Sequence, residues 1–461
     1  MISLKKILFC FSVFFFSLFA TAFLNQSPIF SIALTLACIS FSALRQPIAL
    51  LGILLVTRMS LDHLSENTFL TVGKDISLSL SQMLGVFLLL ASIAIFILHN
   101  KKLVRFVLWK PFSLLIGMNI ILTPWSMSPL TSVQEIARLI SIFSISFLAF
   151  ISVTSLKDVK KVLYLLLLSG IIPMLEATRQ AFFGIGLSDN VVGIPRIYGT
   201  FAHPNALAIF LYSLSVIVVL IYFLKENLSL TTQKNSAIDA LEIFWLPVIL
   251  LSSMALLILT YTRVAWIALF LFLLALALWR YRALILPLII IPIILLVALP
   301  SVQNRVLESF QTSADSSVSW REGIWSDVTA KLRMDGKQYF GVGPDTFSMY
   351  AEKIRGIQFG STDSHNDFVK FFVEDGWLGL SIFIMYLTLL AQEIRKLFTL
   401  PKPYKDIAIV FSFYASTILI ASLSDNIYKN TPIQWVFFIL FGTFLGLKNI
   451  LMDKESPSKI A

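Results

Sequence analysis

The chain has 461 residues, of which 57% are hydrophobic and only 13% are charged, and it contains 40 phenylalanines. This composition excludes an ordinary soluble domain and is typical of a polytopic membrane protein. The formal net charge of +10 would indicate nucleic acid in a soluble chain, but cytoplasmic loops of membrane proteins are enriched in Lys and Arg. Membrane insertion therefore accounts for the charge, and no nucleic-acid partner is expected.

Apolar runs recur along most of the chain, and most are long enough for a helix to cross about 30 Å of hydrocarbon. The first run, residues 7–24, follows Lys5-Lys6 and has the form of a signal peptide, but we interpret it as a retained helix. Further runs lie near residues 28–44, 47–60, 78–98, 106–124, 139–155, 162–182, 205–224, 243–261, 264–279, 283–300, 377–392, 406–424 and 431–447. The sequence predicts an all-α, polytopic membrane helix bundle of about 12–14 transmembrane helices. It does not decide whether residues 28–60 form two full spans.

Loops rich in Lys and Arg alternate with less basic ones, which predicts the orientation of the bundle. The basic loops lie at residues 5–6, 45, 101–105, 157–161, 225, 280–282 and 395–405. By the positive-inside rule they face the cytoplasm, together with both termini. The outer face then receives residues 61–77, 125–137, 183–204, 261–263, 301–376 and 424–431.

The longest hydrophilic segment, residues 301–376, contains a histidine close to its end. His365 lies in a Ser-His-Asn-Asp sequence, shortly before an apolar run that opens at Gly376. A histidine here can titrate near neutral pH while a membrane scaffold holds it. The alternative is an ordinary loop histidine.

Two other outer segments carry cations. Arg196 and His203 precede an apolar run that starts at Pro204-Asn205, and Pro204 suits the first turn of a helix. Arg263 lies between two spans with almost no loop. Anchoring at the membrane surface is the commoner fate of an arginine at a span end, and it is the alternative for Arg263.

The long segment contains two further features. Arg321 and Trp325 begin an amphipathic stretch, and residues 341–345 read Gly-Val-Gly-Pro-Asp. The glycines predict a tight turn, which either lets backbone approach a ligand closely or is simply a turn.

Together these motifs resemble the O-antigen ligase and polymerase superfamily, whose members are integral-membrane glycosyltransferases of the GT-C type. The resemblance covers roughly residues 190–390. Thr262 stands where members often have Ser, and Trp377 stands where the ligase branch tends to have Gly, Thr or Tyr. Because of the second departure, the resemblance does not distinguish a ligase from a polymerase. The motifs are Arg196 with Gly199–Asn205, Leu259–Arg263, Arg321–Trp325 with Gly341–Gly343, and His365-Asn366 followed after nine residues by Gly376.

The resemblance implies an organisation in three regions. Residues 1–190 form N-terminal transmembrane helices, and residues 191–392 form a ligase-like catalytic region that includes a periplasmic loop, 301–376, with short helices. Residues 393–461 form C-terminal helices and a cytoplasmic tail. The protein is then expected in the bacterial inner membrane, with its active site facing the periplasm.

The resemblance also implies a donor glycan on undecaprenyl diphosphate. Arg196 and Arg263 are expected to hold the diphosphate by two-point contacts and to stabilise its growing charge. His365 is the expected general base for the acceptor hydroxyl, oriented by Asp363 or Asp367, although Asp367 could instead cap the next helix. The expected substrate-binding residues are Arg321, Asn366, His203 and Asn205. His203 also has a simpler interpretation, as a packing residue at the start of a helix.

Three function classes remain open from the sequence. A ligase transfers the glycan to the lipid A core, whereas a polymerase transfers it to a second lipid-linked repeat. A flippase is less expected, because neither charges deep within several spans nor an internal repeat is evident.

No cofactor and no metal are expected. The outer acids lack a recognisable Mg²⁺ or Mn²⁺ pattern, and Cys10 and Cys38 lie inside apolar runs without the spacing of a metal site or disulfide. Arg58, Arg138 and Arg179 are interpreted as span-end anchors, with secondary donors to a glycan or a headgroup as the alternative.

Overall fold

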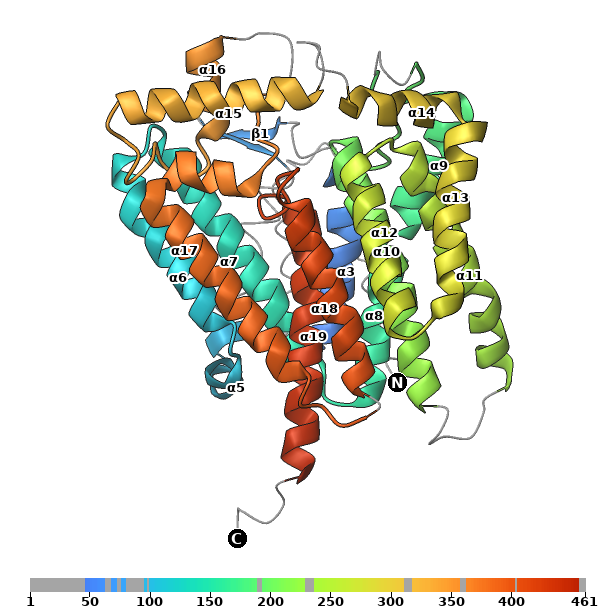
Figure 1. Ribbon diagram of the computed structural model, residues 1–461. Coiled ribbons are helices and arrows are strands. Elements are labelled where there is room, and N and C mark those ends of the chain that lie inside the picture. Colours follow the sequence, from blue (N-terminus) through green and yellow to red (C-terminus); the bar gives the residue numbers. More distant parts are fainter. Residues whose placement is uncertain are drawn as a thin grey trace, which may run out of the picture.

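The computed structural model describes residues 46–62, 68–72, 76–79, 95–97, 99–188, 193–228, 236–310, 317–356, 362–402 and 404–455 (Figure 1). The apolar runs expected at 7–24, 28–44 and most of 78–98 lie outside these residues. Apart from one antiparallel hairpin, β1 (Thr68–Val72) with β2 (Ile76–Ser79), the regular elements described are helices. The predicted all-α membrane bundle is confirmed.

The helices follow the apolar runs of the sequence. Among the described residues, six helices are long and apolar enough to cross a membrane, or seven if one bent pair is a single span. The full number of spans stays a prediction, because three expected runs are not described. The helices are α3 (Pro47–Ser60), α5 (Asn100–Arg105), α6 (Trp109–Leu122), α7 (Pro129–Ser152), α8 (Leu156–Ser169), α9 (Ile171–Phe183), α10 (Pro204–Leu228), α11 (Ser236–Leu259), α12 (Arg263–Trp279), α13 (Ile285–Ala298), α14 (Pro300–Leu307), α15 (Ser317–Met334), α16 (Phe347–Arg355), α17 (Asp367–Leu397), α18 (Tyr404–Ala421) and α19 (Thr431–Glu455).

Helix α10 lies at the centre of the bundle, and 89% of its most apolar window is buried. A helix that is apolar on all sides is expected in such a place. Its few hydroxyl groups bond to neighbouring helices: Ser213 with Tyr414 at 2.8 Å, and Ser215 with Ser253 at 2.9 Å. Interhelical hydrogen bonds of this kind satisfy polar groups that lipid cannot.

Helices α7 and α19 approach each other closely. A Cβ atom on Gly442 would lie 2.2 Å from the carbonyl oxygen of Ser146, so only glycine fits. Close backbone approach through small residues is typical of helix packing in membranes.

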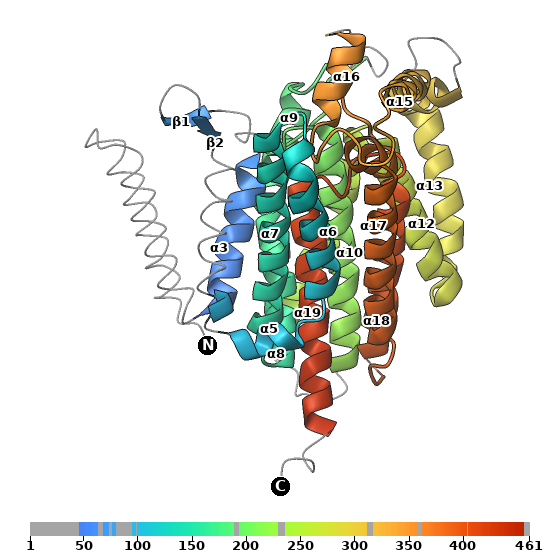
Figure 2. The same cartoon turned by 90° about the vertical axis from the view of Figure 1, so that its left-hand side faces the viewer.

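The two ends of the bundle differ in composition. Helices α14, α15 and α16 cover one end, whereas α5 and the last turns of α19 lie at the other (Figures 1 and 2). The first end carries the segments that the sequence assigns to the outer face, and the second carries the basic loop at residues 101–105. The short helices of loop 301–376 are therefore found where the sequence predicts them.

Helix α17 is interrupted at Gly376, whose φ is 67° and ψ is −163°. The segment before α16 packs against this break by backbone hydrogen bonds, from Gly343 N to Glu374 O at 2.7 Å and from Trp377 N to Gln338 O at 2.9 Å. A Cβ atom on Gly341 would lie 2.1 Å from the Glu374 carbonyl oxygen. These glycines therefore allow two segments of the chain to touch, and this contact accounts for them without a ligand.

Candidate active site

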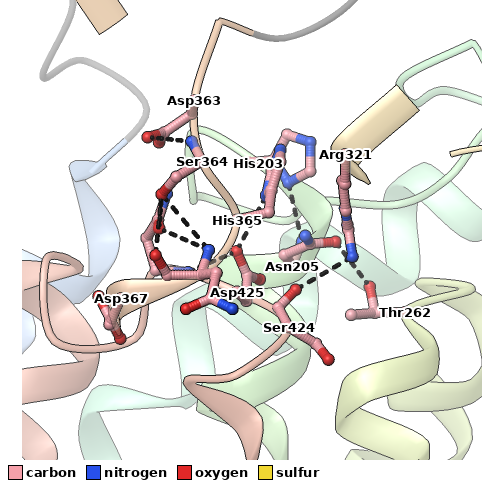
Figure 3. A network of polar contacts seen from close by, with 12 residues as sticks. His203, Asn205, Thr262, Arg321, Asp363, Ser364, His365, Asp367, Ser424 and Asp425 are labelled. Atoms are coloured by element: carbon pink, nitrogen blue, oxygen red, sulfur yellow. Dashed lines mark hydrogen bonds and ion pairs between the residues drawn. The ribbon is translucent and has the colours of Figure 1, made fainter. Parts of the chain in front are cut away.

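His365 is held in a left-handed backbone conformation, with φ of 47°. Such a conformation is unfavourable for a residue with a Cβ atom and is found disproportionately at functional sites. Its Nδ1 lies 3.2 Å from Oδ1 of Asp425, in the turn between α18 and α19 (Figure 3). The sequence analysis missed Asp425. The available signal was its position, since an acid in a short outer turn between two spans is unusual.

In the His365–Asp425 hydrogen bond, the histidine is the donor. Burial works to raise the pKa of the Asp425 carboxyl, but the hydrogen bond and charge of His365, the Asn426 amide and Arg321 hold that pKa below its usual range. An ionised carboxylate only accepts hydrogen bonds. The Nδ1–H of His365 is thus the donor, and the lone pair of Nε2 is left on the opposite side of the ring.

Asp363 and Asp367, which were expected to orient His365, bind other groups. Asp363 pairs with Lys370 at 3.0 Å, and although burial opposes it, this lysine keeps the pKa of Asp363 below its usual range. Asp367 accepts from the backbone amide of Tyr428 at 2.8 Å. The expected orienting role of Asp363 or Asp367 is therefore corrected to Asp425.

Asn366 caps α17. Its Oδ1 accepts from the amides of Phe368 and Val369 at 2.9 and 3.1 Å, and its Nδ2 donates to the Leu423 carbonyl oxygen at 3.0 Å. Asparagine is among the preferred residues for this position. The N-cap of α17 is therefore Asn366 and not Asp367. The Asn366 side chain also holds the loop that carries His365 against the turn after α18.

Arg196 is buried at the junction of α10 and α12. Its Nε donates to the Thr260 carbonyl oxygen at 2.8 Å, and its Nη2 donates to Asn205 Oδ1 and Thr262 Oγ1, both at 3.0 Å. Asn205 and Thr262 thus fix the guanidinium. Thr262 thus supplies a hydroxyl contact to Arg196.

Arg263 opens α12 and belongs to a second charged group. Its Nη1 lies 3.2 Å from Glu308 Oε2 and donates to Ser309 Oγ at 2.6 Å. Arg305 pairs with the same carboxylate at 2.9 Å and donates to the Tyr261 carbonyl oxygen at 3.1 Å. Two arginines share one acid here, so the group keeps a net positive charge.

Arg321 reaches from α15 toward the His365 loop. Its Nη1 donates to the Ser424 carbonyl oxygen at 3.2 Å (Figure 3). The charges of Asp425, Arg305 and Glu308 all act on it. Arg321 therefore lies between the His365–Asp425 pair and the group around Arg263.

His203 completes this arrangement at the start of α10. Its Nδ1 accepts from the Asn205 amide at 3.1 Å, which caps the helix. Burial first, and then the charges of Arg196 and His365, lower the pKa of His203 to about 4, while Asp425 opposes the shift. The ring is therefore neutral at physiological pH and accepts at Nδ1.

A further charged cluster lies beside α17 and was also missed by the sequence analysis. Lys429 pairs with Glu135 at 3.0 Å and with Glu374 at 2.9 Å, and Arg138 binds Glu135 at 2.6 Å. Burial alone would lower the pKa of Lys429, but Glu135, Glu374 and Asp345 raise it above its usual range. This cluster ties the turn after α18 to α7 and α17.

Two further arginines, Arg58 and Arg179, are paired with acids close to them in the sequence. Arg58 lies 2.9 Å from Asp62, and Arg179 lies 2.7 Å from Glu176. That Arg58 and Arg179 anchor the ends of spans at the membrane surface stays a prediction.

Helices α10, α12 and α17 all begin at this end of the bundle, at Pro204, Arg263 and Asp367. Arg196 joins the first two starts through Asn205 and Thr262, whereas Asn366 and Arg321 bond to the turn after α18. Helix N-termini carry partial positive charge and favour anions. The arginines and the helix starts together make this end of the bundle suited to a phosphate group.

Over the described ranges, no cluster of three or more His, Cys, Asp or Glu residues has an arrangement that could hold a metal ion. Independence from metal stays a prediction.

Comparison with known protein families gives one match. The family model described as O-antigen ligase matches residues 247–384, a range that includes Arg263, Arg321 and His365 but not Arg196, His203 or Asp425. A comparison with curated proteins finds no match. The matched range contains segments that meet at the His365 end of the bundle, and over residues 247–384 the chain is similar to the O-antigen ligase family.

Proposed function

We propose that the protein is a glycosyltransferase that moves a glycan from undecaprenyl diphosphate to an acceptor hydroxyl at the periplasmic face of the inner membrane. The observation that carries the proposal is the His365–Asp425 pair, with Arg321 beside it and Arg196 close by. A general base and a cluster of guanidinium groups are the two parts that this transfer needs.

His365 is the proposed base. With Nδ1–H directed to Asp425, the Nε2 lone pair can take the proton of an acceptor hydroxyl placed about 3 Å away. The acceptor oxygen then forms a bond to the anomeric carbon of the donor sugar, and the bond from that carbon to the diphosphate oxygen breaks. Asp425 stabilises the imidazolium that results, as carboxylates do in other histidine-based sites.

The leaving diphosphate is the proposed ligand of the arginines. Negative charge grows on it as the glycosidic bond breaks, and guanidinium groups hold phosphate oxygens in a two-point geometry. Arg196 and Arg263 are proposed to form this clamp, and the position of Arg321 between them and His365 adds a third cation. The starts of α10, α12 and α17 contribute in the same direction.

The acceptor is proposed to be the lipid A core, as in a ligase. A polymerase would use the same residues with a second lipid-linked glycan as acceptor, so the two are separated by which acceptor the purified protein uses.

The test is His365→Ala in purified protein supplied with a lipid-linked glycan and each acceptor in turn. The expected loss is about 100-fold to 10,000-fold in rate, with unchanged insertion and yield. His99→Ala, beside α5 at the opposite end, is the matched control and should keep normal activity. Wild-type turnover by His365→Ala would reject the proposed base.

A further inference from the structure

An aromatic side chain next to His365 has no part in the mechanism above. The ring of Trp320, on α15, lies 6.4 Å from the imidazole of His365, centroid to centroid, with the two planes at 68°. Trp320 is half-buried. A large, partly open aromatic face thus stands beside the proposed base.

The position of Trp320 is fixed from both sides of the site. Trp325, one helical turn and a residue further on, donates from Nε1 to the Ser364 carbonyl oxygen at 2.7 Å. Arg321 donates to the Ser424 carbonyl oxygen at 3.2 Å. Helix α15 is therefore bound to the loop that carries His365 and to the turn that carries Asp425, so Trp320 keeps its place relative to the base.

Helix α15 also packs on α16 and α17 through an apolar cluster. Ile324, Val328 and Leu332 are buried against residues of α16 and α17, including Phe347 and Val373. Trp320 packs at the margin of this cluster and is not part of its buried centre. Trp320 therefore keeps part of its surface outside the packed cluster.

The chemistry of the reaction explains what such a face can bind. An acceptor hydroxyl must lie within about 3 Å of Nε2 of His365, so the sugar ring that carries it comes to rest beside the indole. Sugar rings present apolar C–H groups on their faces, and a tryptophan offers a large rigid surface for them at low entropic cost. The arginines are the proposed ligands of the donor diphosphate, whereas Trp320 lies against the base that is proposed to take the acceptor proton.

We infer that Trp320 is a platform for the acceptor sugar and places its hydroxyl at Nε2 of His365. This inference rests on the proposed function and deepens it, because it assigns a residue that selects the acceptor and not the donor. Trp320 is on this view a binding residue, whereas Trp325 positions the loop.

The experiment measures initial rates of the purified full-length protein against acceptor concentration at saturating donor, and then the reverse. Rough lipopolysaccharide carrying the lipid A core and a second lipid-linked glycan serve as the two acceptor probes. Trp320→Ala should raise the acceptor KM by roughly 5-fold to 30-fold, with the donor KM unchanged. Trp320→Phe should restore most of the affinity, because it keeps an aromatic face.

Three further variants serve as controls. Trp125→Ala removes an exposed tryptophan at the same end of the bundle and should change neither KM. Trp325→Phe loses the N–H that holds Ser364 and should lower kcat more than it raises the acceptor KM. Trp320→Leu keeps apolar volume without an aromatic face, and it decides the question if Trp320→Ala does not fold.

An unchanged acceptor KM in Trp320→Ala and Trp320→Leu would overturn the inference. So would a raised donor KM, or a lower kcat with a shifted pH profile, because these mean that Trp320 contacts the donor or only positions His365. If the wild type transfers to neither acceptor, the proposed function fails instead. Equilibrium binding of both probes to His365→Ala, with and without Trp320→Ala, then tests the platform without turnover.

Discussion

Asp425 Oδ1 lies 3.2 Å from Nδ1 of His365, although 60 residues separate the two in the sequence. The first lies in the turn after α18 and the second in the loop before α17, so two separate outer segments must meet to form the pair. Asn366 Nδ2 joins the same two segments by donating to the Leu423 carbonyl oxygen, and Arg321 ties α15 to the turn after α18 at the Ser424 carbonyl oxygen. The pair is thus held by contacts on both sides of it.

Asp425→Asn should impair catalysis more than binding. An amide can present its NH₂ group to Nδ1, which would favour the tautomer with the proton on Nε2 and remove the base. We expect a fall in kcat of about 100-fold or more, with KM values little changed. Initial rates with purified protein measure this. Asp363→Asn, which alters an acid paired with Lys370, is the control and should have a much smaller effect.

Replacing arginine by lysine separates phosphate binding from membrane anchoring. Lysine also anchors at a membrane surface, but it lacks the two-point geometry of guanidinium. If Arg196 and Arg263 hold the diphosphate, Arg196→Lys and Arg263→Lys should each lose roughly 10-fold to 150-fold in kcat/KM for the donor, which corresponds to about 1.5–3 kcal/mol. Arg280→Lys, at a half-exposed pair with Asp406, is the control. Near-normal transfer by both variants would reject the clamp.

Lys429 should matter for stability. Its side chain is 5% exposed and lies between Glu135 and Glu374, which are 2% and 0% exposed. Removing one partner of a buried ion pair typically costs about 3–5 kcal/mol, because the other charges stay buried. Lys429→Met should therefore lower the melting temperature in detergent clearly. Lys396→Met removes a lysine that is 55% exposed and should cost less than about 1 kcal/mol. Equal melting temperatures for the two variants would contradict this account.

Hydropathy and the order of the motifs were enough to predict most of the described helices, because lipid imposes long apolar segments. Pro111 shows that a proline does not always interrupt a predicted helix. It falls in the first turn of α6, where its missing N–H is not needed, and the helix continues to Leu122. Gly376, by contrast, breaks α17, because two backbones touch there.

The site was only partly predictable. His365, Arg196, Arg263 and Arg321 were found from their motifs, but their partners were not. Asp425 and Lys429 are isolated polar residues in one short turn, and their contacts span 60 residues to His365 and 294 residues to Glu135. Sequence spacing gives no information about pairs of this kind, because tertiary packing alone brings them together.

The orientation in the membrane can be tested with cysteines. Cys10 and Cys38 are first replaced by Ser to remove background labelling. Met334→Cys, at the exposed end of α15, should react with a membrane-impermeant reagent in intact cells. Arg395→Cys, near the opposite end of α17, should react only after the membrane is opened. The reverse pattern would place His365 in the cytoplasm and reject the proposed mechanism.

His203 should make stability depend on pH. Its folded pKa of about 4 lies below the ordinary 6.5, so the folded state favours the neutral ring. Above pH 6.5 this contribution is fully present. As pH falls below 6.5 the unfolded chain gains the proton first, and stability is lost down to about pH 4, where the folded state is protonated as well. The loss has an upper limit of about 3 kcal/mol, which solvent around the half-buried ring reduces.

His203→Asn keeps an acceptor for the α10 cap and removes the titration. Its melting temperature should fall less between pH 7 and pH 5 than that of the wild type. Asp345 should change the stability of the protein in the opposite direction. Burial and the Glu135 charge raise the pKa of its carboxyl to about 6. Its contribution to the stability of the folded protein is therefore present at low pH and is lost as pH rises toward 6. Asp345→Asn should therefore fall more steeply than the wild type on acidification, since its favourable low-pH contribution is gone. Parallel curves for wild type and His203→Asn would show that His203 is not held neutral, and its role as an acceptor at the start of α10 would then fail.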